Sequence, residues 1–114
     1  MCKWSGVCVH EGRLYFCPFK ASAVLILDPT SKQVSFIEAG KDAMCKWSGV
    51  CVHEGLLYFC PCADSTVLVL DPTSKQVSFI ETGKDGGGTK WRGVCVHEGL
   101  LYFCPYDASA VLVL

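Results

Sequence analysis

The sequence predicts an all-β fold in which four-stranded antiparallel sheets follow one another along the chain. The stretch KWSGVCVHEGLLYFCP at residues 46–61 recurs almost unchanged at residues 3–18 and 90–105. Its tryptophan returns at intervals of 43 and 44 residues. Each copy holds short strand-like runs rich in Val, Phe and Tyr, and none shows a helical period. Four strands in a repeat of this length are typical of a β-propeller blade.

The first copy begins with a predicted hairpin. Residues 6–10 (GVCVH) alternate as a half-buried strand does, and residues 13–18 (RLYFCP) return. Glu11-Gly12 lies between them and is a two-residue turn signal, because glycine can supply a positive φ. With this turn, Cys8 pairs with Tyr15.

Two further strands complete the predicted blade. Residues 23–28 (AVLILD) form a continuous apolar run, which is expected of a strand buried on both faces. The DPTSKQ segment is a proline-containing turn. Residues 33–38 (QVSFIE) form the fourth strand, and the loop after them leads to the next copy.

We expect one repeat array over residues 1–114, with a blade at 3–45, a second at 46–89 and a partial third at 90–114. Eleven predicted strands make fewer than three blades, whereas closed propellers typically have four or more. The array is therefore predicted to be an incomplete ring.

An incomplete ring would leave apolar side chains such as Val7, Phe16 and Leu25 in water at its ends. The sequence therefore suggests a fragment of a larger propeller or a truncated gene product. The alternative is that several copies assemble into one ring.

The repeat resembles the tandem KWxGGVxxxxGxIYxIPxxxxxVLIIDP repeats of long propeller proteins related in style to kelch and WD40 repeats. The resemblance covers essentially the whole chain and implies the propeller fold. The resemblance gives little information about function, because enzymes, lectins and scaffold proteins all use the propeller fold. Cys8 and Cys17 stand where that group has larger aliphatic residues, and the second glycine of its GG pair is absent. The matching positions in the first copy are Lys3, Trp4, Gly6, Val7, Gly12, Leu14, Tyr15, Pro18, Val24, Leu25, Leu27, Asp28 and Pro29.

Composition narrows the classes of partner. The net charge is -1 and no block of like charges occurs, which argues against a nucleic-acid or anionic-membrane partner. No apolar run approaches the ~18 residues of a membrane helix. The N-terminus lacks a signal-peptide pattern, and nine cysteines are an odd number. We therefore expect reduced thiols and a cytoplasmic protein.

The copies differ mainly along one predicted rim. In a propeller, the connection between the second and third strands lies on the same rim as the connection between blades. Arg and aromatic residues there are common interface anchors, although loops also drift freely. The opposite rim is nearly constant, apart from Arg13. The candidate binding residues of this variable rim are Phe19, Lys20, Cys62, Asp64, Arg92, Tyr106 and Asp107.

Catalytic and metal signals are weak. Cys8 and His10 share a strand face, and the pair recurs at 51/53 and 95/97, but zinc usually takes four ligands. We therefore expect no metal and no cofactor. A Cys8–Cys17 disulfide stays an alternative to free thiols. No residue set that breaks the repeat symmetry forms a catalytic constellation, so we expect no catalytic residues and no enzyme.

The repeated tryptophan, Trp4, Trp47 and Trp91, is expected to pack between blades rather than to form a ligand-binding ring. The preferred function is a non-enzymatic binding or scaffold module that contacts an unknown protein partner through the variable rim. The alternatives are a structural fragment without its own ligand, a lectin-like propeller and a metal- or thiol-dependent module. Further partners would be a second copy or the remaining blades of a longer chain.

Overall fold

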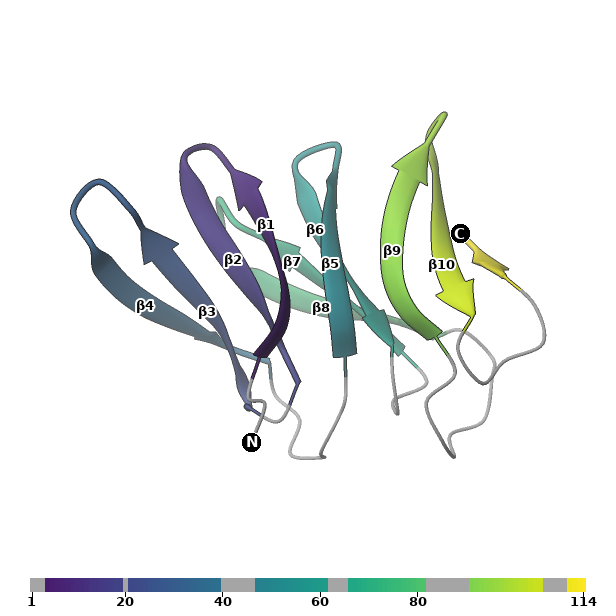
Figure 1. The fold of residues 1–114 in the computed structure, drawn as a ribbon, viewed down its shortest axis with the longest axis horizontal. Helices are drawn as coiled ribbons and strands as arrows, with labels where there is room; N and C mark the ends of the chain where they lie inside the picture. The colour runs from purple at the N-terminus through teal and green to yellow at the C-terminus, as the bar shows by residue number, and fades with distance from the viewer. Residues whose placement is uncertain (1–3, 20, 40–46, 62–65, 82–90, 106–110) are drawn as a thin grey trace.

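The computed structural model describes residues 4–19, 21–39, 47–61, 66–81, 91–105 and 111–114, which form three antiparallel sheets (Figure 1). Sheet 1 has the order β1 (Trp4–His10), β2 (Arg13–Pro18), β3 (Ala23–Asp28) and β4 (Gln33–Glu38). Sheet 2 has the order β5 (Trp47–His53), β6 (Leu56–Pro61), β7 (Thr66–Asp71) and β8 (Gln76–Glu81). Sheet 3 has the order β9 (Trp91–His97), β10 (Leu100–Pro105) and β11 (Leu112–Val113).

This arrangement confirms the predicted all-β fold of blade-like sheets. The segments given above contain no helix of the length and apolarity needed to cross a membrane.

The first hairpin of each sheet has the predicted turn. Glu11 and Gly12 have φ values of 49° and 79°, which is the positive-φ pair of a type I′ turn. The turn fixes the register, so Cys8 pairs with Tyr15 as predicted. Sheets 2 and 3 repeat this geometry with Glu-Gly turns at 54–55 and 98–99.

A hydrogen-bonded turn joins β3 to β4. The Asp28 Oδ1 atom accepts a hydrogen bond from the Thr30 backbone N–H at 3.0 Å. The Lys32 N–H donates to the Asp28 carbonyl at 2.6 Å, and the Ser31 Oγ accepts from the Gln33 N–H at 3.3 Å. These bonds explain why the DPTSK letters recur in sheet 2, where Asp71 accepts the equivalent bond from Thr73 at 3.0 Å.

The three sheets stand side by side, with the inner strands β1, β5 and β9 in a row (Figure 1). Their backbones touch at one glycine in each repeat. A Cβ on Gly6 would lie 2.8 Å from the Gly49 Cα, and a Cβ on Gly49 would lie 2.8 Å from the Gly93 Cα. A β-bulge separates Trp4 from Val7, so this close approach sits on an irregular part of the strand.

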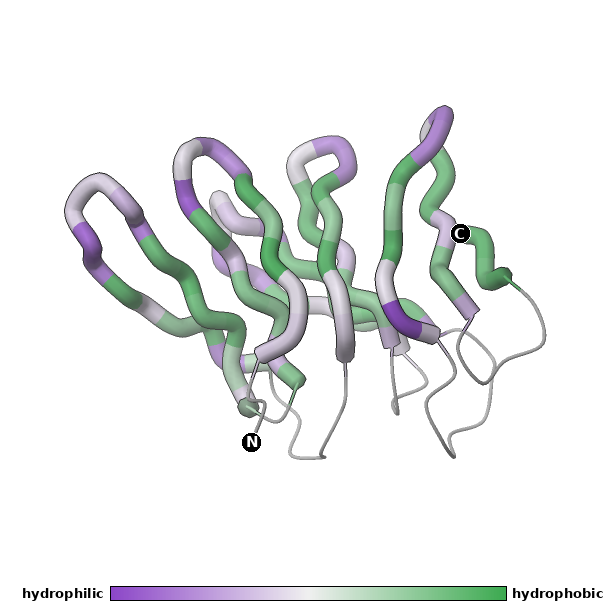
Figure 2. Tube along the Cα trace, in the orientation of Figure 1, coloured by the Kyte–Doolittle hydropathy of each residue, from purple (hydrophilic) through white to green (hydrophobic). Residues whose placement is uncertain are grey.

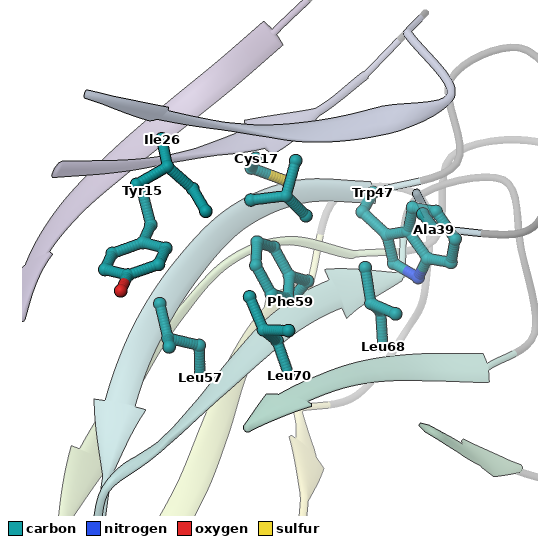
Figure 3. Packing of buried hydrophobic residues seen from close by; sticks show 10 residues of the cluster. Tyr15, Cys17, Ile26, Ala39, Trp47, Leu57, Phe59, Leu68 and Leu70 are labelled. Atoms are coloured by element: carbon teal, nitrogen blue, oxygen red, sulfur yellow. The ribbon is translucent and has the colours of Figure 1, made fainter. Parts of the chain in front are cut away.

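Hydrophobic residues are concentrated in the strands, while the hairpin turns are more hydrophilic (Figure 2). Hydrophobic side chains from neighbouring sheets pack against each other. Two clusters result. The cluster between sheets 1 and 2 contains Tyr15, Cys17, Val24, Ile26, Ala39, Trp47, Leu57, Phe59, Leu68 and Leu70 (Figure 3). The cluster between sheets 2 and 3 contains Cys60, Val67, Val69, Trp91, Leu101 and Phe103.

The third strand of each repeat was expected to be buried on both faces, and this holds only in the middle sheet. Residues 66–70 of β7 are all buried, because sheets 1 and 3 cover both faces of sheet 2. In β3, Val24 and Ile26 are buried, whereas Leu25 and Leu27 are only partly buried. The expectation for residues 23–28 was therefore wrong, since only one face of sheet 1 has a neighbouring sheet among the described residues.

Two of the three tryptophans, Trp47 and Trp91, pack between sheets, as predicted. Trp47 is completely buried, and its indole Nε1–H donates to the Thr66 carbonyl at 2.9 Å. The ring also stacks on Phe79, with 6.2 Å between centroids. Trp91 is buried as well, whereas Trp4 in sheet 1 is only partly buried.

Candidate functional site

The inner strands β1, β5 and β9 begin on the same side of the molecule (Figure 1), and the second residues of these strands form a row. Ser5 and Ser48 occupy the first two places of this row, and their Oγ atoms are 3.3 Å apart. Arg92 takes the third place, so the repeat symmetry is broken by a cation at sheet 3. Ser48 is buried, while Arg92 is exposed.

The Arg92 guanidinium contacts an aromatic ring from another repeat. Its central carbon lies 5.9 Å from the centroid of Phe19, which follows the end of β2 in sheet 1. An exposed cation–π pair of this kind contributes about 0.5–1 kcal/mol. The contact connects sheet 1 with sheet 3, although sheet 2 stands between them in the row of inner strands.

Two of the seven predicted rim residues are therefore brought together. Phe19 and Arg92 are far apart in sequence and form one surface feature on the side where the second strands end. The other five predicted residues lie outside the described residues; they are Lys20, Cys62, Asp64, Tyr106 and Asp107.

A groove of about 350 Å³ lies on the opposite rim and was missed from the sequence. Sheet 1 supplies most of its lining, and the β7–β8 turn of sheet 2 supplies the rest. Its lining residues are Arg13, Tyr15, Ile26, Asp28, Ser31, Gln33, Ser35, Phe36, Ile37, Pro72 and Lys75. One feature of the sequence could have indicated this groove. Arg13 is the exception on the otherwise constant rim, because the other copies have leucine at its position.

The groove places two cations near a buried phenol. Arg13 and Lys75 approach from different sheets, and both are exposed. Burial raises the pKa of the Tyr15 hydroxyl, and the Arg13 charge beside it acts in the opposite direction. Tyr15 is therefore a neutral hydrogen-bonding group at physiological pH. The groove offers a ligand two cations, the Asp28 carboxylate and hydroxyl groups.

Two cysteines of the inner strands, Cys8 and Cys51, are thiols with little nucleophilic character. Burial raises the pKa of Cys8 to about 11, and burial together with the neighbouring Cys8 and Cys95 raises the pKa of Cys51 to about 11. Cys8 and Cys17 are not joined to each other, so the alternative of a disulfide between them does not hold. At neutral pH these groups pack as small hydrophobic side chains.

The histidines of the Cys-x-His pairs pack against tyrosine rings. The His10 ring is tilted against Tyr15 with 6.4 Å between centroids, and the same contact recurs at His53 and Tyr58 with 6.3 Å. Within the ranges that the structure describes, no three His, Cys, Asp or Glu side chains converge as metal ligands would.

Comparisons with known proteins find the fold but no sequence family. No protein-family model matches the chain, and no curated protein sequence does. The solved structure of virginiamycin B lyase from Staphylococcus aureus is similar, with a TM-score of 0.74 and 11% identity over 97% of this chain and 40% of that chain. A streptogramin B lyase has a TM-score of 0.79 and 18% identity over 96% of this chain and 36% of that chain.

Glutaminyl cyclase from Myxococcus xanthus is also similar, with a TM-score of 0.69 and 13% identity over 99% of this chain and 55% of that chain. The neighbours have propeller-type folds, so the chain is a β-propeller-type repeat array. It spans little more than half, or less, of each neighbour. At these identities the likeness shows the fold alone, and the resemblance to the KWxGG repeats stays a prediction.

The expectation that the chain is not an enzyme was wrong. The similar structures are enzymes by name, two lyases and one cyclase. The expectation depended on finding a complete catalytic constellation within one chain. Since this chain covers only part of each neighbour, a site shared by many blades would leave only some of its residues here. The lack of a complete set of catalytic residues in this 114-residue chain therefore does not exclude an enzyme.

Proposed function

We propose that the chain binds a protein partner through the variable rim, with Phe19 and Arg92 as the anchor. The contact between these two side chains supports this proposal most directly, because it joins repeats 1 and 3 where the copies differ in sequence. An exposed guanidinium beside a half-buried ring suits a peptide segment that carries acidic and apolar side chains.

The cation and the ring would divide the recognition between them. Arg92 is exposed and would pair with a carboxylate at the rim, which favours fast association and correct orientation. Phe19 is partly buried and would supply apolar area at low entropic cost. Because the two side chains come from different sheets, the surface forms only when the sheets are stacked.

The test is selection of peptides from a displayed random library on the folded chain. The rim variant Arg92→Ser gives repeat 3 the residue of repeats 1 and 2, and the matched control Arg13→Leu gives repeat 1 the residue of repeats 2 and 3. Both variants remove one arginine, but from opposite rims. We expect the selected peptides to be acidic, to bind Arg92→Ser and Phe19→Ala at least tenfold more weakly, and to bind Arg13→Leu normally. Peptides that bind all variants equally, while thermal unfolding is unchanged, would refute the proposal.

The groove supports a second candidate function, which is binding of a small anion. Arg13 and Lys75 line it from two sheets and outnumber its one carboxylate, Asp28, and the neutral Tyr15 hydroxyl also lines it. Titration with inorganic phosphate or citrate, followed by NMR shifts of residues at β2 and the β7–β8 turn, tests this function. The two arginine variants exchange roles here: Arg13→Leu should abolish the shifts and Arg92→Ser should leave them. Shifts spread evenly over the surface would contradict a site in the groove.

A further inference from the structure

The chain uses one interface twice. The leading face of a sheet is the face toward the next sheet, and in sheet 1 it consists of Tyr15, Cys17, Val24 and Ile26. The trailing face is the face toward the preceding sheet, and in sheet 2 it consists of Trp47, Leu57, Phe59, Leu68 and Leu70. Between sheets 2 and 3 the same repeat positions meet again, with Cys60, Val67 and Val69 packed against Trp91, Leu101 and Phe103.

Among the residues that the structure describes, two faces of this interface have no neighbouring sheet in a single chain. The leading face of sheet 3 consists of Tyr102, Cys104, Val111 and Val113, at the repeat positions of Tyr15, Cys17, Val24 and Ile26. Val111 is 52% exposed and Val113 is 45% exposed, whereas Val24 and Val67 are completely buried.

The trailing face of sheet 1 is also uncovered. It consists of Trp4, Leu14, Phe16, Leu25 and Leu27, all of which are partly buried. Four of the equivalents in sheet 2 are completely buried leucine or phenylalanine, and the fifth is the completely buried Trp47. An apolar face of this kind on a folded sheet is typical of an interaction surface.

The inner strand of sheet 3 also lacks the contact that the other two inner strands make with the next sheet. A Cβ on Gly6 or Gly49 would collide with the next glycine, but a Cβ on Gly93 would meet nothing within 4 Å. Gly93 nevertheless has a positive φ of 84°, close to the 98° of Gly6 and Gly49. The backbone of sheet 3 is thus shaped for a further inner strand.

We propose that the leading face of sheet 3 binds the trailing face of sheet 1 in a second copy of this chain, head to tail. The sequences of the two faces indicate that the binding partner is a second copy of the chain. The second copy would present Trp4, Leu14, Phe16, Leu25 and Leu27, which are identical in type to the residues that sheet 2 presents to sheet 1. It would also place its Gly6 against Gly93. The contact is heterologous, so it extends to a closed ring when its rotation closes and to longer assemblies when it does not.

Gly93→Ala tests the proposal with an unusually close control. Gly93 and Gly99 have φ values of 84° and 81°, and a Cβ on either meets nothing within 4 Å in a single chain. The backbone strain of an alanine is therefore matched at the two positions. Only at position 93 would the Cβ also meet the Gly6 Cα of the second copy, as position 49 meets Gly93 inside the chain.

Sedimentation velocity of the 114-residue chain over a wide concentration range gives the readout. We expect the wild-type chain and Gly99→Ala to associate similarly and Gly93→Ala to associate at least tenfold more weakly. Val113→Asp, on the leading face, is a second variant that should stay monomeric if Gly93→Ala fails to fold. A wild-type chain that stays monomeric at all concentrations, or association equal in Gly93→Ala and the wild type, would overturn the proposal.

Mixing two defective chains tests the head-to-tail geometry. Val113→Asp blocks the leading face and Leu27→Asp blocks the trailing face, so each variant alone should be monomeric. Their mixture keeps one intact pair of faces and should give a 1:1 dimer that grows no further. In that dimer, Cys104 of the Leu27→Asp chain should be protected from alkylation, as its equivalents Cys17 and Cys60 are buried within the chain. A mixture that stays monomeric would contradict the proposed pairing of faces.

Discussion

Gly49 and Gly93 lie so close together that a Cβ atom on Gly49 would be 2.8 Å from the Gly93 Cα. The atom in the way belongs to the backbone of β9, which cannot rotate aside as a side chain can. Gly49 also has a φ of 98°, which is strained for any residue with a Cβ. The contact between the inner strands β5 and β9 therefore requires glycine for two independent reasons.

Gly49→Ala should consequently lower the free energy of unfolding by about 2–4 kcal/mol, from overpacking and backbone strain together. Gly55→Ala is the matched control, because Gly55 has a φ of 79° but open space around its Cβ position. It should cost only about 1 kcal/mol. Urea unfolding of both variants measures the difference. Equal costs would mean that the inner strands separate easily and that their contact contributes little.

Leu70 and Leu27 occupy the same repeat position in sheets 2 and 1 but differ in their surroundings. Leu70 is completely buried between sheets 1 and 2, whereas Leu27 lies on the uncovered trailing face of sheet 1. Leu70→Ala should cost about 2–5 kcal/mol, and Leu27→Ala should cost clearly less. Chemical denaturation at low protein concentration measures both values. A cost at Leu27 as high as at Leu70 would show that the trailing face is already covered in solution.

The elements were predictable because each has a local cause. The Glu11-Gly12 turn fixes the register of the first hairpin, and Asp28 accepts the bonds of the next turn, so residue type alone decides both. The burial of the third strand was not predictable in the same way. Residues 23–27 and 66–70 have nearly the same letters, yet only the second set is buried on both faces. Burial there depends on the number of neighbouring sheets, which no local pattern encodes.

The candidate site was predictable in part for a similar reason. Comparing the copies found Phe19 and Arg92 as departures from the repeat, but their contact depends on how three sheets stack. The groove was missed because most of its lining is the same in the first two copies, and only Arg13 and Ile26 distinguish repeat 1. Because the lining residues are repeated, they gave no reason to expect a groove between sheets 1 and 2 in particular.

Trp47 provides a test of the packing between sheets 1 and 2. Its indole is completely buried and donates to the Thr66 carbonyl at 2.9 Å. Trp47→Phe removes this bond and leaves a smaller ring, so it should cost about 2–4 kcal/mol. Trp4 makes the equivalent bond to the Ala23 carbonyl at 3.0 Å but is only partly buried, so Trp4→Phe should cost less. Thermal unfolding of the two variants shows which one loses more stability. A larger loss for Trp4→Phe than for Trp47→Phe would contradict the burial of Trp47.

Stability should fall at high pH because of the inner-strand thiols. Burial raises the pKa of both Cys8 and Cys51 from 9.0 to about 11, so the folded state favours the neutral thiols. A raised pKa in the folded state gives a stability contribution that is complete below pH 9 and is lost as the pH rises through 11, because the unfolded chain ionises first. Replacing both residues with alanine should therefore make the urea midpoint depend less on pH between 9 and 11. An unchanged slope in the double variant would show that other groups cause the alkaline loss of stability.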